Sequence, residues 1–453
     1  MASDWDTYPI SDFVTLSQGL AINAKSKYLL EETGLPLLRI TDLINGTQVH
    51  FVNEEKAPPK CIATDHELIY TRTGQVGLVY RNKVGVVHNN CFKVIPSPEL
   101  DKDFLYWFLF QESTKAHVNA VASGSVQKDL NHAAFLTLSI PKPELSEQKA
   151  IASILDSLDD KIELNRQMNE TLEAMAQALF KSWFVDFDPV IDNALAAGNA
   201  IPDEFIERAE QRKGIEKKDN SEIQSLFPDE FEFTEEMGWI PKGWASDTVK
   251  ELANVTDYVA NGSFASLKEN VTLSDDPEYA LYIRTTDYKN DFSLAKAKYV
   301  NKQSYDFLKK SILEGYEVII SNVGDTGTVF RPPVWLNQPM TLGSNAIAIK
   351  NEDMSNFLQY YFSSYFGQYQ ISSIVGGSAQ PKFNKTDFRA LAVYFGSLEL
   401  VSKFEEACQP LRAKIDTNLS QILLLSNIRD TLLPKLMSGE LRIPDATALV
   451  ENV

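Results

Sequence analysis

The sequence has few cysteines and histidines and no long hydrophobic run. Its three cysteines, Cys61, Cys91 and Cys408, are odd in number and widely separated, so they indicate neither a disulfide framework nor a zinc cluster. The five histidines include no pair four residues apart. No apolar stretch approaches the ~20 residues of a membrane-spanning helix, and the N-terminal MASDWDTYPISDF has no apolar signal core. These absences predict a cytoplasmic protein without a metal site.

The sequence also lacks the motifs of several common enzyme classes. The glycine pairs Gly74/Gly77 and Gly324/Gly327 miss the Gly-Lys-Ser/Thr ending of a phosphate-binding loop, so we interpret them as turn glycines. Neither the Asn-Pro-Pro-aromatic tetrapeptide of adenine amino-methyltransferases nor Gly-x-Ser-x-Gly is present, and the carboxylates form no cluster with histidine. We therefore predict no catalytic residues and no cofactor bound by this chain.

The most informative feature that is present is an internal repeat. Residues 146–184, SEQKAIASILDSLDDKIELNRQMNETLEAMAQALFKSWF, carry apolar and small residues at alternating steps of four and three, and residues 401–437 repeat that ladder 253 positions later. Asn165 and Asn418 occupy the same place in the two ladders, and Asn169 is a further amide in the first. Because a buried amide needs a partner, we predict that these three residues fix the register of two packed helices.

The repeat extends upstream of both helices. FLYWFLFQ from Phe104 matches FLQYYFSS from Phe357, and SGSVQKDLN (123–131) matches GGSAQPKFN (376–384), both at an offset of 253. LIYTRTGQVGLVY (68–80) parallels VIISNVGDTGTVF (318–330) at an offset of 250, and LLRITDL (37–43) parallels YIRTTDY (282–288) at 245. The offset between matching segments thus changes slightly along the chain. Small changes of this kind predict loop insertions in two copies of one domain, each ending in a long helix.

The expected fold class is α+β, with two repeated mixed α/β domains separated by an antiparallel two-helix coiled coil and related by a pseudo-twofold axis. The expected segments are a first domain over 1–145, a first long helix over 146–184, an acidic connector over 185–240, a second domain over 241–397, a second long helix over 398–437 and a tail over 438–453. Ser146 is the expected N-cap of the first long helix. Pro410 is expected to kink or delay the second helix, and the tail is expected to fray. A further helix is expected over 102–118, and a tight loop at 73–77.

The net charge of −19 argues against a nucleic-acid partner for the chain as a whole. The acidity is concentrated in residues 146–240, which hold 22 Asp and Glu against 9 Lys and Arg. Residues 1–145 hold 16 acids against 13 bases, and residues 241–397 hold 16 against 15. The two domains are therefore near neutral and can carry local basic faces.

One short segment in each domain, the Gly-Ser-x-Gln segment at 124–127 and 377–380, carries residue types that hydrogen-bond base edges and phosphates. In the first domain Arg72, Arg81 and Lys83 also surround the loop at 73–77, with no acid between residues 72 and 83. The Gly-Ser-x-Gln segments could equally be structural turns, and both interpretations stay open. The candidate DNA-binding residues are Arg72, Gln75, Arg81, Lys83, Ser125, Gln127, Lys128 and His132 in the first domain, and Asn322, Arg331, Ser378, Gln380, Lys382 and Lys385 in the second. Positions that differ between the copies, such as Asp129 against Lys382 and His132 against Lys385, are the better candidates for sequence reading. We interpret the repeated pairs Arg39/Asp42 and Arg284/Asp287 instead as internal ion pairs.

Several segments together resemble one known protein family. They are LSEQKAIASILDSLDDKIELNRQMNETLEAMAQALFKSWFVDFDP (145–189), LFPDEFE (226–232), GWIPKGW (238–244) and IRDTLLPKLMSGEL (428–441). Over nearly the whole chain, the sequence resembles the specificity subunit of Type I restriction-modification systems. The resemblance implies two target-recognition domains that each read half of a split double-stranded DNA site, with the helix pair as a ruler. It also implies two methyltransferase subunits that use S-adenosylmethionine and a motor endonuclease that uses ATP and Mg, with no active site in this chain.

Two other functions remain open at the level of the sequence. The chain could be a coiled-coil scaffold or adaptor whose domains bind no DNA of their own. It could also be a fused modification enzyme, which would require a cofactor pocket that no motif in the sequence indicates.

Overall fold

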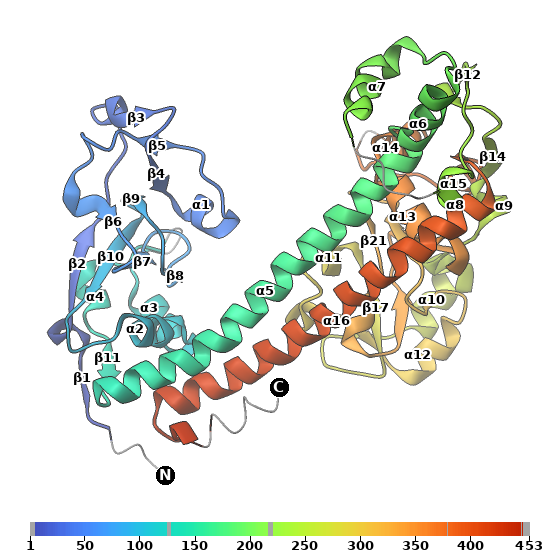
Figure 1. The fold of residues 1–453 in the computed structure, drawn as a ribbon. Coiled ribbons are helices and arrows are strands. Elements are labelled where there is room, and N and C mark those ends of the chain that lie inside the picture. The colour runs from blue at the N-terminus through green and yellow to red at the C-terminus, as the bar shows by residue number, and fades with distance from the viewer. Residues whose placement is uncertain (1–4, 125–127, 216–220, 378, 445, 447–453) are drawn as a thin grey trace. The chain divides into compact units, whose positions relative to one another are not determined.

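The computed structural model describes residues 5–124, 128–215, 221–377, 379–444 and 446 (Figure 1). The chain divides into two compact units. The first unit comprises Met1–Leu164 and Gln421–Val453, and the second comprises Asn165–Ser420. The two long helices, α5 (Leu145–Phe184) and α16 (Leu398–Met437), therefore each contribute one half to each unit.

Three sheets form the domain of the first unit. The four-stranded antiparallel sheet has the order β2 (Val14–Gln18), β10 (Cys91–Pro96), β7 (Leu68–Thr71), β8 (Val79–Tyr80). The five-stranded sheet has the order β3 (Leu30–Glu31), β5 (Phe51–Val52), β4 (Leu35–Leu38), β9 (Gly85–Val87), β6 (Ile62–Ala63), in which β4 and β9 pair in parallel. β1 (Thr7–Pro9) pairs with β11 (Ser139–Pro141). Strand β7 is buried along its whole length, which explains its unbroken apolar run.

The shorter helices of the first unit are α1 (Ile40–Asn45), α2 (Lys102–Phe110), α3 (Glu112–Val121) and α4 (His132–Phe135). The prediction of one helix over 102–118 is wrong, because Gln111 has an extended backbone (ψ 142°) that separates α2 from α3. Asp101 caps α2 by accepting hydrogen bonds from the backbone amides of Asp103 and Phe104, both at 3.0 Å. The predicted tight loop at 73–77 is confirmed as the turn between β7 and β8.

The domain of the second unit repeats this strand order. The four-stranded sheet is β15 (Asn254–Asp257), β23 (Ala346–Lys350), β20 (Val318–Ser321), β21 (Val329–Phe330), and the pair is β14 (Ala245–Thr248) with β24 (Ala392–Phe395). The five-stranded sheet is β16 (Leu273–Ser274), β18 (Tyr299–Val300), β17 (Ala280–Ile283), β22 (Met340–Leu342), β19 (Ile312–Leu313), with β17 and β22 parallel. The helices are α9 (Val249–Leu252), α10 (Phe264–Asn270), α11 (Thr285–Tyr288), α12 (Lys302–Phe307), α13 (Ser355–Ser363), α14 (Tyr365–Ser373) and α15 (Lys385–Arg389). The two strand orders match position by position, as expected for a duplicated mixed α/β domain.

The connector between the domains is folded and belongs to the second unit. It contains α6 (Asp188–Ala197), α7 (Ile206–Lys213), α8 (Ser221–Gln224), β12 (Phe231–Thr234) and β13 (Gly238–Pro241). Phe187, Val190 and Phe227 are buried in the core of the second unit. The Arg208 guanidinium binds the Asp188 carboxylate with N–O distances of 2.7 and 2.8 Å, which fixes α7 against α6.

The two long helices are equal in length, at 40 residues each. The prediction that Pro410 delays the second helix is wrong, because α16 runs through it without interruption. Pro410 is exposed, so its ring meets solvent and the helix gives up one backbone hydrogen bond there. The predicted N-cap at Ser146 is also wrong by position, since α5 begins at Leu145.

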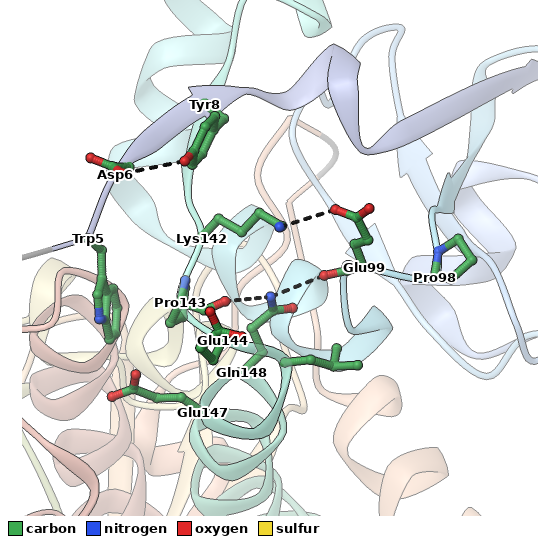
Figure 2. Close-up of a pocket in the computed structure, with 11 residues that line it drawn as sticks. Trp5, Asp6, Tyr8, Pro98, Glu99, Lys142, Pro143, Glu144, Glu147 and Gln148 are labelled. Atoms are coloured by element: carbon green, nitrogen blue, oxygen red, sulfur yellow. Dashed lines mark hydrogen bonds and ion pairs between the residues drawn. The ribbon is translucent and has the colours of Figure 1, made fainter.

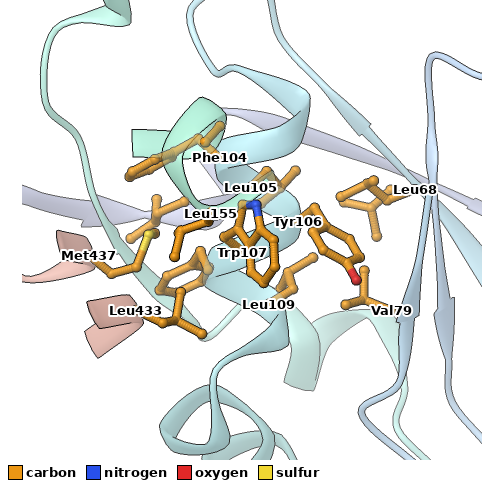
Figure 3. Close-up of a cluster of buried hydrophobic side chains, with 14 of the residues drawn as sticks. Leu68, Val79, Phe104, Leu105, Tyr106, Trp107, Leu109, Leu155, Leu433 and Met437 are labelled. Atoms are coloured by element: carbon orange, nitrogen blue, oxygen red, sulfur yellow. The ribbon is translucent and has the colours of Figure 1, made fainter. Parts of the chain in front are cut away.

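The predicted apolar ladders meet in both units. In the first unit Leu155 and Leu158 of α5 share one core with Leu432 and Leu436 of α16. Figure 3 shows Trp107 of α2 in this core, with Leu155 from one long helix and Leu433 and Met437 from the other. In the second unit the later residues of α5 pack with the earlier residues of α16, among them Phe180 and Trp183 with Phe404 and Cys408. Each unit therefore packs one part of α5 against the opposite part of α16.

The amides of the ladder lie between the helices in the second unit. The side-chain nitrogen of Asn418 donates to the side-chain oxygen of Asn169 at 2.8 Å, and the Asn169 nitrogen donates to the Ile415 carbonyl at 3.4 Å. Asn418 is fully buried, and Asn165 is 6% exposed. These contacts place Asn169 against Asn418 across the helix pair, and the role of the three amides in fixing the register stays a prediction.

We expect the single substitution Asn418→Leu to reduce the free energy of unfolding by about 1–2 kcal/mol, because it leaves the half-buried Asn169 oxygen without its donor. Adding Asn169→Leu removes that stranded acceptor and should recover most of the loss. Urea unfolding of both variants and of Asn169→Leu alone measures the coupling between the two residues. Effects that simply add would show that the amide pair does not act as a unit.

The described residues after α16 fold back onto the first unit. Leu441 and Ile443 pack against its core, and Ala446 is fully buried there. Arg442 binds Glu147 at 3.0 Å and lies over the ring of Trp5. The expectation that the tail frays after Leu441 is therefore wrong for residues 442–444 and 446, because apolar side chains and an ion pair hold them. None of the described helices has the length and apolar character that a bilayer span requires.

Candidate functional site

In each unit, two loops that are distant in sequence lie side by side. In the first unit the backbone amide of Gly74 donates to the Lys128 carbonyl at 2.9 Å, and in the second unit the amide of Gly324 donates to the Pro381 carbonyl at 2.8 Å. Isolated bridges join Thr73 to Asp129 and Val323 to Lys382. We call these the paired loops: residues 72–78 with 123–124 and 128–130 in the first unit, and residues 322–328 with 376–377 and 379–383 in the second. The two repeated motifs found in the sequence thus form one site per unit.

Glycine is required at the tips of these loops by backbone conformation. Gly74 and Gly324 have φ values of 80° and 81°, a region that favours glycine. Gly327 is further restricted, because a Cβ there would lie 2.9 Å from the side chain of Gln368 on α14. The interpretation of these residues as turn glycines is confirmed.

Arg72 links the paired loops of the first unit. Its guanidinium binds the Asp129 carboxylate at 2.7 Å, donates to the Leu130 carbonyl at 3.2 Å and donates to the Gln18 side-chain oxygen at 3.1 Å. The Thr73 hydroxyl donates a hydrogen bond to the same carboxylate at 2.8 Å. The charge of Arg72 is therefore used inside the protein, where it holds one loop against the other.

The paired loops of the second unit have the same backbone geometry with different charges. Asn322 stands in place of Arg72 and donates from its side chain to the Phe383 carbonyl at 3.4 Å. Lys382 stands in place of Asp129 and is exposed. Lys385, the counterpart of His132, binds Asp257 at 3.0 Å. At this loop position the first unit therefore has a carboxylate paired with Arg72, and the second unit has an exposed lysine.

Several predicted residues lie at the exposed edge of the paired loops. Gln75 and Gln380 are exposed. Lys128 is also exposed, and its ammonium donates to the backbone and side-chain oxygens of Asn119, both at 3.1 Å. His132 is half-buried with its ring 5.0 Å from that of Phe92, and burial together with the nearby Arg72 charge lowers its pKa. The remaining predicted loop residues, Ser125, Gln127 and Ser378, lie outside the described residues.

Arg81 and Arg331 do not belong to the paired loops, which corrects their expected place as cations beside them. Arg81 follows β8 and binds Asp103 of α2 at 3.1 Å and Asp156 of α5. The Arg331 side chain donates to Asn356 of α13 at 2.9 Å. These two arginines occupy equivalent positions after equivalent strands, and we call them the strand anchors. Each fastens the end of the β-hairpin to a helix within its own unit.

Burial dominates the electrostatics of the strand anchors. Arg331 is 9% exposed, and burial lowers its pKa to about 10. Burial raises the pKa of the Asp156 carboxyl, although Arg81 and a hydrogen bond of 2.8 Å from the Trp107 indole oppose that shift. Lys83, two residues after Arg81, is exposed and takes no part in this cluster.

One ion pair between the long helices was not predicted from the sequence. Arg429 of α16 binds Asp159 of α5 at 2.7 Å within the first unit. A signal was present, since Arg429 falls on the apolar ladder where a charged side chain needs a buried partner. The two internal pairs that the sequence did predict are confirmed, with Arg39 bound to Asp42 at 2.6 Å and Arg284 bound to Asp287 at 2.5 Å.

A polar cavity of about 520 Å³ lies at the start of α5 (Figure 2). Its buried side chain, Gln148, donates to the carbonyls of Glu99 and Pro143 at 3.2 and 2.9 Å, and accepts from the Asp101 amide at 2.8 Å. Lys142 pairs with Glu99 at 3.2 Å. These polar groups already bind one another, so the cavity gives no reason to place a ligand there.

In the described part of the chain, no three His, Cys, Asp or Glu side chains are grouped as a metal ion would require.

Several known proteins are similar to this chain in sequence or in fold. A family model described as "Type I restriction modification DNA specificity domain" matches residues 2–174 and 241–428. The specificity subunit of the Type I restriction enzyme MjaIX from Methanocaldococcus jannaschii is 25% identical over 456 residues, covering 98% of this chain and 94% of that protein. The HindI specificity subunit from Haemophilus influenzae is 26% identical over 488 residues, covering 97% of this chain and 100% of that protein. The crystal structure of an S subunit from M. genitalium has the same fold, with a TM-score of 0.55, 17% identity and 96% coverage of both chains.

Proposed function

The chain belongs to the Type I restriction-modification DNA specificity family, and from this we propose that each unit reads one half of a bipartite, asymmetric DNA site. Membership of this family makes the chain the component that gives DNA-sequence specificity, and not the catalytic component, of a restriction-modification complex. In our proposal the paired loops are the reading surface of each unit.

One observation carries the proposal: the two units present the same loop junction with different side chains on it. A shared backbone frame supports the same mode of approach to DNA in both halves. Different side chains at equivalent positions, such as Asp129 and Lys382, support different base preferences. Two identical surfaces would instead favour a symmetric site.

Local charge supports the same surface. In the second unit Lys382 and Gln380 of the paired loops are exposed. The acid of the same described loops, Asp325, is bound to Lys289 at 2.6 Å. A polyanion is attracted to such a surface and repelled by the acidic connector. The strand anchors Arg81 and Arg331 are not part of the proposed surface, because their charges are used internally.

We also propose that α5 and α16 form an antiparallel coiled coil that sets the distance between the half-sites, with the two units related by a pseudo-twofold axis. The equal helix lengths and the matching strand orders support this arrangement. A 40-residue helix is about 60 Å long, which is enough to separate two stretches of one duplex.

The partners in this proposal are double-stranded DNA, two methyltransferase subunits and motor endonuclease subunits. S-adenosylmethionine, ATP and Mg are used by those subunits, while this chain binds none of them. The family membership supports assembly with partner subunits and DNA.

The test is substitution within one pair of loops. We expect Gln380→Ala with Lys382→Ala to weaken binding of the assembled complex to its target, and to reduce the slope of log affinity against log salt by about one. Methylation mapping should show relaxed selection in one half-site with the other half-site unchanged. Lys414→Ala, which removes an exposed lysine on α16, is the matched control. Equal loss in both half-sites, or no change in either, would remove the paired loops from the reading surface.

The scaffold alternative makes a different prediction in the same assay. If the chain only recruits proteins, the assembled complex shows the same affinity for target and non-target duplexes, and loop substitutions leave the methylation pattern unaltered. A salt-dependent preference for one duplex sequence separates the two functions.

A further inference from the structure

An aromatic surface lies where the connector meets the domain of the second unit. We call it the connector patch: Phe233, Met237, Trp239, Tyr365, Phe366 and Tyr394. Phe233 and Tyr365 are 62% and 90% exposed, and the other four are half-buried. Two ring contacts lie within the patch, with centroids 5.6 Å apart for Phe233 and Trp239 and 6.1 Å apart for Phe366 and Tyr394, and Met237, Trp239, Phe366 and Tyr394 line one cavity. Exposed aromatic clusters of this kind mark interaction sites more often than chance.

A cavity of about 200 Å³ lies behind the patch. Trp239, Trp244, Phe366 and Tyr394 line it together with the carboxylate-bearing Glu204. The combination of several aromatic rings with a carboxylate suits a cationic side chain, because ring faces and carboxylates both attract positive charge. The size of the cavity is that of one long side chain.

The rim of the patch is acidic. Residues 229–236 contain five acids and no base, and residues 185–240 contain 15 acids against 5 bases. Glu236 accepts a hydrogen bond from the Tyr394 hydroxyl, and burial raises the pKa of that hydroxyl to about 12, so it remains a donor at neutral pH. Carboxylates in this number repel DNA phosphates. The occupant of this surface is therefore expected to be a protein with basic residues.

We propose that the connector patch docks a basic segment of a protein subunit of the assembled complex, with an arginine or lysine side chain entering the cavity. The proposal rests on the proposed function, because it takes the partner from the same complex. Buried aromatic anchors supply the affinity in such an interface, and the acidic rim supplies its orientation and association rate.

The patch makes the chain asymmetric. The connector follows α5, whereas the described residues after α16, 438–444 and 446, lie on the core of the first unit with Leu441 and Ile443. In the described part of the chain the connector patch therefore belongs to the second unit alone, although the domains are duplicated. A partner that docks on it is held at that unit.

The test uses the complete complex, assembled from this chain and the methyltransferase and endonuclease subunits of its own system. The variant Phe233→Ser with Glu235→Lys changes two exposed side chains, one in the patch and one in its acidic rim. Phe264→Ser with Glu269→Lys makes the same chemical change at two exposed positions of α10 and serves as the control. A second patch variant, Tyr365→Ser, removes its most exposed ring. Native mass spectrometry gives the subunit composition, and titration of the missing subunit gives its affinity.

We expect the patch variants to lose one copy of a partner subunit, or to bind it at least tenfold more weakly, which corresponds to about 1.4 kcal/mol. The control should keep the wild-type composition, and the thermal unfolding of all variants should match that of the wild type. Wild-type composition and affinity in both patch variants would overturn the proposal. Failure of the proposed function is a separate outcome, because it appears as absent sequence preference in the wild-type complex.

Discussion

Removing a matched heptad from both long helices is expected to shorten the DNA spacer by about two to three base pairs, with both half-sites unchanged. Seven helical residues span about 10 Å, and one base pair of duplex spans about 3.4 Å. Deleting residues 161–167 and 420–426 keeps the Asn169–Asn418 hydrogen bond and the Asp159–Arg429 ion pair on either side of the cut. Because a deletion of seven residues preserves the phase of the apolar ladders, the two shortened helices can still pack against each other. Methylation mapping in a host that carries the variant measures the spacer.

The control for this experiment is a deletion of residues 161–167 from α5 alone. It leaves α5 seven residues shorter than α16, so the two apolar ladders no longer align over their full length. We therefore expect loss of the folded complex. A matched deletion that folds and methylates sites with the original spacer would refute the ruler. New half-sites with the original spacer would refute the assignment of base reading to the domains.

Substituting Arg81 by methionine is expected to reduce the free energy of unfolding by about 2–4 kcal/mol. The substitution keeps most of the side-chain volume and removes the cation from Asp156 and Asp103, whose side chains are 26% and 33% exposed. A carboxylate left partly buried without its counter-charge accounts for the loss. Lys83→Met, at an exposed position two residues away, should change stability by less than about 0.5 kcal/mol. Urea unfolding followed by tryptophan fluorescence measures both.

The loss caused by Arg81→Met should depend on pH in one direction. Burial raises the pKa of Asp156 in the folded state, and removing Arg81 raises it further, since the guanidinium opposes that shift. A group whose folded-state pKa is raised favours folding when it is protonated. The difference from wild type should therefore be largest at neutral pH and shrink as the pH falls through the folded-state pKa of Asp156. A difference that grows on acidification would show that another interaction of Arg81 dominates. Adding Asp156→Leu should recover stability at neutral pH.

The long helices illustrate what could be predicted from the sequence. The apolar period runs over about forty positions and occurs twice, so its start and end were placed within one residue of those observed for α5. The amide pair was predictable because Asn418 falls where the ladder requires an apolar residue. Pro410 was misjudged because its effect on a helix depends on whether its ring meets solvent, and exposure is not readable from the ladder alone.

The strand anchors illustrate what could not be predicted. Residues 72–83 contain no acid, which made Arg81 resemble a free cation beside the loop. Its partners, Asp103 and Asp156, lie 22 and 75 residues away in sequence. The paired loops were recognised as repeats, but their adjacency was not, because hydrogen bonds between backbone groups leave little trace in residue identity. Only the tertiary fold brings these segments together.

The way the paired loops are joined has an evolutionary consequence. Their junction includes main-chain hydrogen bonds, from Gly74 to the Lys128 carbonyl and from Gly324 to the Pro381 carbonyl, and these bonds do not involve the side chains exposed at the loop edges. Exposed positions such as Gln75 and Gln380 can therefore mutate with little effect on folding. Under the proposed function, a lineage that carries this scaffold would explore new target sequences by point mutation, one half-site at a time, without first acquiring compensating changes in the core.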